Sequence, residues 1–222
     1  MRRKTVVLPE PPGPRKGTSG VGEKLRLLIL GDSAAAGVGA DHQDLALLGQ
    51  LVRKLSESFC VSWQLEATTG ATTAQSNERI DELNNCQFDV VLTSLGVNDI
   101  TSNVSLSEWK HIQNDLHKKC LKIFGADLVI VTAVPPMGQF LALPQPLRWY
   151  LGNRSNQFND VLEKQIFAKS KIRFMSIEII EDITAMASDG FHPGEKVYEL
   201  WAIHAAKEIT SFYQNNNIQK ST

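Results

Sequence analysis

The stretch that decides the fold is LRLLILGDSAAAGVG, residues 25–39. It opens with Leu25–Leu30, a short and nearly continuous apolar run, which is typical of a strand buried on both faces of a parallel sheet. The strand is expected to end at Gly31, and small residues follow it. Open α/β sheets place their chemistry where strands end at the carboxyl edge. We therefore expect Ser33 at that edge, beside backbone N–H groups that can face a developing negative charge.

The remaining sequence alternates strand patterns with helix patterns. Apolar runs predict further strands at 61–66, 88–95, 128–132 and 172–175. Helical spacing predicts helices at 44–59, 73–83, 105–124, 147–168 and from about Pro193 to Phe212, with an irregular or short helical piece at 177–186. Such an alternation calls for a parallel sheet that helices cover on both faces. The sequence therefore predicts a three-layer α/β/α fold around a five-stranded parallel sheet.

Length and composition favour a single domain. The chain has 222 residues, of which 42% are hydrophobic, and domains run to roughly 250 residues before they split. Residues 1–23 are rich in Pro, Gly and basic residues, which predicts an N-terminal arm that is extended or flexible. The domain is expected over residues 24–214, and a C-terminal tail over 215–222.

The net charge, the apolar runs and the cysteine content limit which partners the protein is expected to bind and in which cellular compartment it is expected to lie. The net charge of −1 argues against a nucleic-acid partner bound through its phosphates. The apolar run after the basic start is too short for a signal peptide, and no run reaches the roughly 18 residues that a membrane span needs. Cys60, Cys86 and Cys120 are odd in number and lie in unrelated contexts, so they do not indicate disulfides. We expect a cytoplasmic protein; the sequence leaves its oligomeric state open.

Residues able to carry out a reaction follow the first three predicted strands and precede the last predicted helix, and in a parallel sheet these turns meet at one edge. They are Ser33, Gly70, Asn98, Asp189 and His192. A serine hydroxyl is a weak nucleophile that needs an adjacent base, and the base needs a partner that holds its tautomer. His192 and Asp189 suit these two roles because they lie three residues apart in one turn. The sequence therefore predicts a catalytic group of Ser33, His192 and Asp189.

Attack on an ester carbonyl puts negative charge on its oxygen, which preorganised donors must stabilise. The backbone N–H groups of Ser33 and Gly70 and the side-chain amide of Asn98 can supply three donors. Each residue also has a simpler interpretation. Taken alone, Ser33 is more often a helix cap, and the other residues are more often turn formers.

These residues resemble the motifs of the SGNH hydrolases, also called GDSL-type esterases and lipases. Residues 31–33 (GDS) resemble the nucleophile motif, Gly70 the lone glycine, residues 96–99 (GVND) the G-x-N-D motif and residues 189–193 (DGFHP) the D-x-x-H motif. One motif alone is weak, whereas four in order with matching secondary structure are strong. The resemblance covers about residues 25–212. It implies a flavodoxin-like sheet, a Ser-His-Asp site, three oxyanion donors and no cofactor.

The chain departs from that family at one place. Ala34–Ala36 stands where family members often carry Leu or Ile after the serine, which alters the space beside the nucleophile but removes no catalytic group. Among the branches of the family, the chain looks most like the small single-domain bacterial esterases and thioesterases. The N-terminal arm lies outside the resemblance.

The proline-rich segment 135–146 follows the fourth predicted strand and is too apolar for a solvated loop. We hypothesise that it forms one wall of an acyl pocket, with Met137, Phe140 and Leu143 binding substrate; the alternative is that it only covers the core. A metal site is not expected, because His111 and His117 are six residues apart and do not share a helix face.

The sequence thus predicts a serine hydrolase that cleaves small carboxylic esters or thioesters through an acyl-enzyme. An acyltransferase or a carbohydrate O-deacetylase with the same residues is an alternative, and a non-catalytic binding module is a weaker one. A nucleotide-binding domain is disfavoured, because Gly37-Val38-Gly39 lacks the third glycine of a dinucleotide motif and no G-K-[ST] occurs. The natural substrate and the acyl length stay open.

Overall fold

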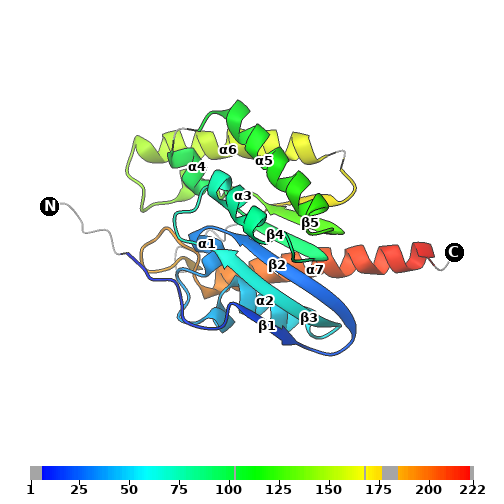
Figure 1. Ribbon diagram of the computed structural model, residues 1–222. Helices are drawn as coiled ribbons and strands as arrows, with labels where there is room; N and C mark the ends of the chain where they lie inside the picture. The colour runs from blue at the N-terminus through cyan, green and yellow to red at the C-terminus, as the bar shows by residue number, and fades with distance from the viewer. Residues whose placement is uncertain (1–6, 103, 168, 177–184, 221–222) are drawn as a thin grey trace.

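Helices cover both faces of one six-stranded sheet, so the protein has three layers (Figure 1). The structure is a computed structural model that describes residues 7–102, 104–167, 169–176 and 185–220. Its strands are β1 (Lys16–Ser19), β2 (Glu23–Gly31), β3 (Phe59–Ala67), β4 (Val90–Ser94), β5 (Leu128–Thr132) and β6 (Ile172–Met175). Its helices are α1 (Ser33–Ala36), α2 (Leu47–Leu55), α3 (Thr73–Glu82), α4 (Val97–Thr101), α5 (Leu106–Lys122), α6 (Leu147–Ile166) and α7 (Glu195–Lys220), with 3₁₀ turns η1 (Gln43–Leu45) and η2 (Met137–Gln139).

The order of strands in the sheet explains where the site forms. The order is β1-β3-β2-β4-β5-β6, and the strands from β2 to β6 are parallel. The first parallel strand therefore lies between the second and the third, which is the flavodoxin-like order. Open sheets of this kind bind ligands at the switch point, here between β2 and β4. The predicted α/β/α fold is confirmed, and Ser33 follows β2 at that switch point.

The sheet has one strand more than the sequence predicts. β1 pairs antiparallel with β3, within the segment interpreted as an arm, so the prediction of five strands is corrected to five parallel strands and one antiparallel edge strand. The sequence of β1, KGTS, has no apolar alternation and its side chains are mostly exposed. Backbone pairing holds this strand, and apolar periodicity gives no signal for it.

Two apolar cores lie on the two faces of the sheet. Helices α2 and α7 pack on one face, and α3, α5 and α6 pack on the other (Figure 1). The side chains of β2 alternate between them: Leu27 and Ile29 belong to the first core, and Leu28 and Leu30 to the second. Burial on both faces is the physical reason for the continuous apolar run of this strand.

The last helix is longer than predicted. α7 ends at Lys220, whereas the sequence predicts an end near Phe212 and a tail at 215–222. Residues 214–220 hold no Gly or Pro that would stop a helix, which agrees with the observed end of α7 at Lys220. Residues 1–6, 177–184 and 221–222 lie outside the described residues, so the interpretations that fall on them stay predictions.

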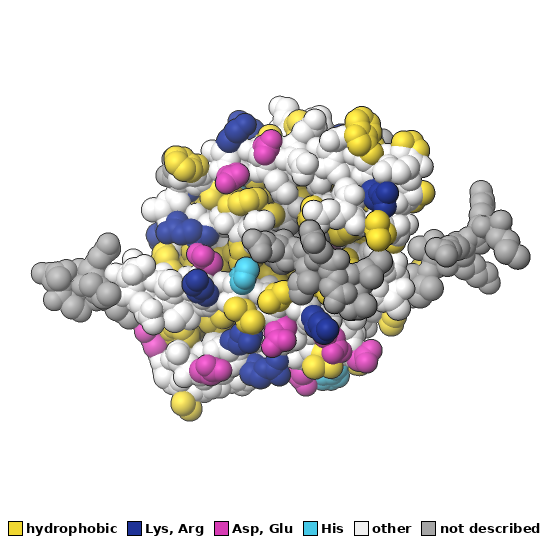
Figure 2. All heavy atoms as spheres, turned by 180° about the vertical axis from the view of Figure 1, so that it is seen from behind, with side chains coloured by type: hydrophobic (Ala, Val, Ile, Leu, Met, Phe, Trp, Pro, Cys, Tyr) yellow, Lys and Arg dark blue, Asp and Glu magenta, His cyan; other side chains and the backbone are white. Residues whose placement is uncertain are grey.

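The surface carries mixed charge. On the face shown in Figure 2, Lys and Arg side chains are interspersed with Asp and Glu, so the described residues form no large field of one sign on that face. No helix within the described ranges is both long and apolar enough to cross a membrane.

Candidate active site

The carboxyl ends of β3, β2 and β4 lie level with one another. Gly31 of β2 pairs with Ala67 of β3 and with Ser94 of β4. The pairing continues one residue further, because the N–H of Asp32 donates to the carbonyl of Ser94 at 3.1 Å and the N–H of Thr68 donates to the carbonyl of Gly31 at 3.1 Å. The turns after these three strands therefore begin side by side.

Ser33 is the first residue of α1, a helix of four residues. Asp32 caps this helix, since its side chain accepts from the N–H of Ala34 at 3.1 Å. The first N–H groups of a helix have no partner within the helix. The N–H of Ser33 is therefore available to a ligand, and the side chain of the same residue is only half-buried.

Ser33 contacts a histidine from the far end of the chain. Its Oγ lies 2.9 Å from Nε2 of His192, and Nδ1 of His192 lies 2.6 Å from Oδ2 of Asp189. The side chain of His192 is 18% exposed, so the ring is shielded but still open to a substrate. The structure thus brings the three residues of the predicted catalytic group into one hydrogen-bonded chain.

The carboxylate of Asp189 is held in its charged form. Burial raises the pKa of Asp189, but hydrogen bonds from the ring of His192 and from the N–H groups of His192 (3.0 Å) and Phe191 (2.9 Å) together lower that pKa below its usual range. An ionised carboxylate only accepts hydrogen bonds, so Nδ1 of His192 donates and Nε2 of the neutral ring accepts from Ser33. A general base needs this tautomer.

Two contacts fix the loop that carries His192 against the loop after α1. Gly39 has a φ of +103°, and a Cβ at this position would lie 2.3 Å from the carbonyl oxygen of Pro193, so the approach requires glycine. Tyr198, in the first turn of α7, donates its hydroxyl to the carbonyl of Val38 at 2.7 Å. Together these contacts hold the imidazole beside the start of α1.

Asn98 connects the other turns of the site. Its Nδ2 donates to the carbonyl of Ala71 at 2.9 Å and lies 3.5 Å from Oδ2 of Asp32. The neighbouring Gly70 is exposed and has a φ of +84°, a conformation that favours glycine, and nothing lies within 4 Å of where its Cβ would be. The structure therefore places the three predicted oxyanion donors on adjacent turns.

Two carboxyl groups next to the site are buried. Burial raises the pKa of Asp32 to about 7, although the N–H of Ala34 partly offsets this effect. Burial also raises the pKa of Asp99, which accepts from the N–H of Thr73 at 3.1 Å and from its hydroxyl at 2.9 Å. Asp99 thereby joins α4 to the start of α3 and fixes the backbone beside Asn98.

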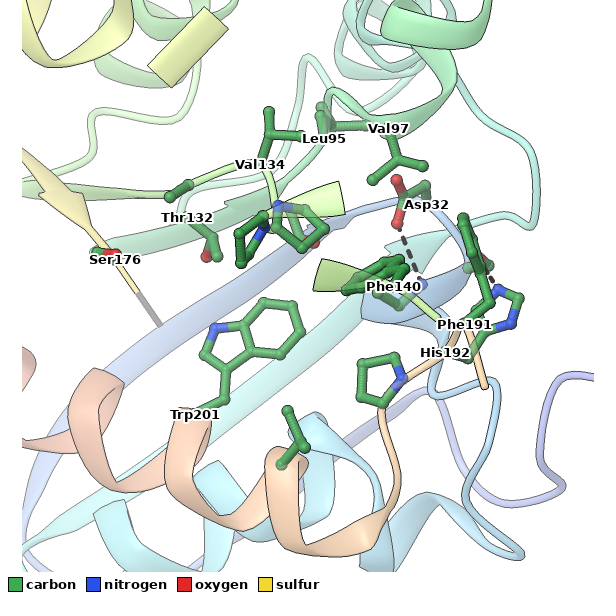
Figure 3. A pocket seen from close by; sticks show the side chains of 18 of the residues that line it. Asp32, Leu95, Val97, Thr132, Val134, Phe140, Ser176, Phe191, His192 and Trp201 are labelled. Carbon is green, nitrogen blue, oxygen red and sulfur yellow. Dashed lines mark hydrogen bonds between the residues drawn. The ribbon is translucent and has the colours of Figure 1, made fainter. Parts of the chain in front are cut away.

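A mostly apolar cavity of ≈ 270 Å³ lies beside Ser33 and His192 (Figure 3). Ligand pockets have volumes of roughly 300–1,000 Å³, so this cavity suits a small group. Its apolar wall includes Leu95, Val97, Val134, Phe140, Phe191 and Trp201.

Only one of the three predicted pocket residues lines this cavity. Phe140 belongs to its wall. Met137 and Leu143 do not line it, because Met137 is fully buried in the core beneath the loop and Leu143 packs against the same core. A loop that wraps over a core turns only some of its apolar side chains toward the cavity, and sequence alone does not show which ones.

Asn159 of α6 anchors the loop after β5. Its Oδ1 accepts from the N–H of Val134 at 2.8 Å, and its Nδ2 donates to the carbonyl of Val134 at 2.8 Å. This double contact imitates the pairing of a neighbouring strand. It fixes the wall of the cavity where the backbone leaves the sheet.

Sequence reasoning did not assign Asp32, Asn159 or Trp201 to the site. The sequence did contain a signal for Asp32, because a charged residue at the end of a buried strand needs a bonding partner or a function. Trp201 lies four residues after Val197, and both line the cavity from one face of α7. This spacing is the same for a residue that only packs in the core, so periodicity could not distinguish the two roles.

The fold and the site define a carboxylic ester hydrolase. The chain belongs to the GDSL-like lipase/acylhydrolase family, because residues 29–200 match the model of that family. No curated protein sequence matches the chain.

Solved structures of esterases share the fold. The psychrotrophic esterase EstA from Pseudoalteromonas sp., in a structure inhibited by monoethylphosphonate, is 21% identical with a TM-score of 0.65 over 85% of this chain and 98% of that chain. A family 3 carbohydrate esterase from Clostridium thermocellum is 20% identical with a TM-score of 0.66 over 86% of this chain and 98% of that chain. The acetylxylan esterase Axe2 from Geobacillus stearothermophilus is 16% identical, with a TM-score of 0.62 over 85% of this chain and 95% of that chain. At these identities the similarity shows the fold alone.

Proposed function

We propose that the protein hydrolyses small carboxylic esters or thioesters through an acyl-enzyme on Ser33. His192 accepts the proton of Ser33 Oγ as this oxygen attacks the carbonyl carbon, and then gives the proton to the leaving alcohol or thiol. Water attacks the acyl group in the second half of the reaction, again with His192 as base, and the acid leaves. Asp189 orients the ring of His192 and stabilises its charged form.

The negative oxygen of each tetrahedral intermediate needs donors. In this proposal they are the N–H of Ser33, the N–H of Gly70 and the second hydrogen of the Asn98 amide. The first amide hydrogen is used on the carbonyl of Ala71, and the second exchanges its long contact of 3.5 Å with Asp32 for the negative oxygen. The contact with Ala71 orients the amide before substrate arrives, so the donor needs little reorganisation during the reaction.

One observation carries the proposal. It is the hydrogen-bonded chain from Ser33 through His192 to Asp189, with contacts of 2.9 and 2.6 Å. A helix cap or an isolated Asx turn does not require a contact between residues so far apart in the sequence. The adjacent cavity supports the assignment of an acyl substrate, because its mostly apolar wall suits the carbon chain of an acyl group.

Labelling and substrate panels test this function. A fluorophosphonate probe is expected to modify Ser33 in the native protein, and a panel of acyl esters, thioesters and acetylated sugars gives the preferred class. Ser33→Ala is expected to lower turnover by roughly 10³-fold or more with the fold intact by circular dichroism. Full activity of Ser33→Ala would refute the mechanism.

The same assay separates the alternatives. An acyltransferase would form new esters with added alcohols faster than it releases acid. An O-deacetylase would favour acetylated sugars over simple esters. A binding module would neither react with the probe nor turn over any of the esters.

A further inference from the structure

Two buried polar atoms without a partner belong to side chains that line the cavity beside Ser33. Thr132 at the end of β5 is 3% exposed, and Trp201 in α7 is 2% exposed. Among the residues that the structure describes, neither Oγ1 of Thr132 nor Nε1 of Trp201 has a hydrogen-bond partner. In Figure 3 the indole nitrogen of Trp201 lies on the side of the ring toward Thr132 and Ser176, away from His192.

A plain alkyl chain in this cavity would leave both atoms buried and unpaired, which is unfavourable. The indole N–H of Trp201 is only a donor, so its partner must be an acceptor. The hydroxyl of Thr132 can donate to the same acceptor or accept from a hydroxyl group. An oxygen atom on the bound group satisfies these atoms, and a methylene does not.

We propose, on the basis of the function proposed above, that the acyl group of the substrate carries an oxygen atom along its chain, as in hydroxyacyl, oxoacyl or alkoxyacyl esters. The ester carbonyl lies at Ser33, the chain enters the cavity, and the chain oxygen binds Trp201 and Thr132. A site that hydrogen-bonds a substrate oxygen rejects the analogue without it more strongly than an apolar site rejects one methylene.

A scan of oxygen position tests the proposal. The p-nitrophenyl ester of hexanoic acid is compared with the esters in which an ether oxygen replaces one chain methylene, at each position in turn. Rates are corrected for the reactivity of each ester with hydroxide, because a nearby oxygen activates the carbonyl. The wild-type protein is expected to prefer one ether-bearing ester over hexanoate by about tenfold or more in kcat/KM.

Two variants each remove one hydrogen-bond donor from the cavity wall and keep the side chain close to its original shape. In Trp201→Phe and in Thr132→Val, the ratio of kcat/KM for the ether-bearing ester to kcat/KM for hexanoate is expected to fall most of the way to one. Ile203→Val, on the exposed side of α7, is expected to leave this ratio unchanged. A wild-type protein that prefers hexanoate, with the same ratio in both variants, would overturn the proposal and leave the esterase function intact. Absence of any Ser33-dependent hydrolysis would instead refute the proposed function itself.

A second inference concerns the segment before the family match, which begins at residue 29. Glu10 binds the turn that carries Gly70: its Oε1 accepts from the N–H and from the hydroxyl of Thr69, each at 2.8 Å. Its Oε2 pairs with Arg15 at 2.9 Å, and Arg15 also donates to the carbonyl of Ala67 at the end of β3. Residues 10–15 therefore hold both sides of this turn.

The same segment also contacts the loop after the nucleophile. Pro11 is buried, and a carbon of its ring lies 2.9 Å from the position that a Cβ of Gly37 would take. The carbonyl of Pro12 accepts from the N–H of Gln43 at 2.9 Å, and the side chain of Gln43 donates to the carbonyl of Ala36 at 2.8 Å. The segment thus connects the end of α1 to the turn after β3.

Glu10 is charged in this arrangement. Burial raises its pKa, but the hydrogen bonds from Thr69 and the ion pair with Arg15 together lower it below its usual range. Gly70, the next residue after Thr69, has open space where a Cβ would be, and the side chain of Asn98 binds the same turn at the carbonyl of Ala71.

We infer that Glu10 is a positioning residue, which fixes the Gly70 N–H toward the negative oxygen of the intermediate. This inference also depends on the proposed function, since a misplaced donor weakens binding of the transition state more than binding of the ester. Loss of the carboxylate therefore lowers kcat and leaves KM nearly unchanged.

Kinetics per active site test this role. Sites are titrated with a fluorophosphonate, so that kcat refers only to folded, reactive protein. Glu10→Ala is expected to lower kcat about tenfold with KM within about twofold, and Glu10→Gln, which keeps an acceptor, to recover most of the rate. Glu57→Gln, an exposed residue outside the segment, is the matched control. A Glu10→Ala protein with lower stability but unchanged kcat per titrated site would show that the contact is only structural.

Discussion

The amide of Asn98 is the oxyanion donor whose contribution is easiest to isolate, because the other two donors are backbone groups. Asn98→Ala removes this donor and the contact with Ala71, but leaves the chain from Ser33 to Asp189 in place. We expect kcat to fall by about 10²–10³-fold with a much smaller change in KM, since the donor acts mainly on the transition state. Steady-state kinetics on a short-chain ester measures both.

A neighbouring substitution provides the control. Thr101→Ala changes an exposed residue one turn further along α4. It is expected to keep kcat within about threefold, since the hydroxyl of Thr101 donates only to the backbone carbonyls of Val97 and Asn98 and its loss leaves the Asn98 amide in place. Equal rates for wild type and Asn98→Ala would remove this amide from the oxyanion hole.

Asp32 makes stability depend on pH. Its pKa is about 7 in the folded protein because of burial, and 3.8 is the ordinary value. Between these values the folded protein binds a proton that the unfolded chain does not bind, so the free energy of unfolding falls as pH rises, by at most about 1.4 kcal/mol per pH unit from this group. Asp32→Asn cannot titrate, so its stability relative to wild type is expected to rise from pH 4 to pH 8.

Urea unfolding at several pH values measures this difference. The exposed carboxylate of Asp44 supplies the control variant Asp44→Asn. If the curves of Asp32→Asn and wild type stay parallel across this range, Asp32 does not carry a raised pKa.

At the scale of elements, the close contact between Gly39 and Pro193 fixes the relation of the two loops that carry Ser33 and His192. Gly39→Ala forces a Cβ to 2.3 Å from the carbonyl oxygen of Pro193 at a φ of +103°. We expect a loss of stability of about 1–3 kcal/mol from strain, and a lower kcat because His192 moves with Pro193.

Gly125→Ala separates strain from displacement. Gly125 also has a positive φ, +68°, but nothing lies within 4 Å of where its Cβ would be. This variant is expected to lose stability and to keep its kcat. If both variants kept full activity, the contact at Gly39 would not position His192.

The sequence predicted the elements that bury a face and missed those that do not. The central parallel strands β2, β4 and β5 have apolar runs because both of their faces are buried, and the structure confirms the predicted parallel strands. β1 is held by backbone hydrogen bonds, and α1 and α4 are too short to show a helical period. The contact of Ser33 with His192 could be expected because parallel strands share one edge. The place of Trp201 in the cavity wall could not be predicted, because a residue of α7 that only packs in the core has the same helical spacing.

At the scale of the whole molecule, the two apolar cores share one sheet. Side chains of β2 alternate between them, so neither core can lose its strands without exposing the other. The residues of the proposed site come from both sides as well: Asn98 lies beside the helices of one face, and His192 precedes α7 on the other. The site therefore depends on the integrity of both layers.

Unfolding as a single unit is the expected consequence, and two tryptophans report on the two cores. Trp109 is buried in the core with α5 and α6, and Trp201 in the core with α2 and α7. In variants that keep only one of them, with Phe at the other tryptophans, the fluorescence midpoint in urea is expected to coincide with the far-UV circular dichroism midpoint of the same variant. Because each variant is its own reference, a general loss of stability from the substitutions does not affect the comparison. If the fluorescence midpoint differs from the circular dichroism midpoint in either variant, the two layers unfold separately. The shared strands would then not couple the unfolding of one core to that of the other.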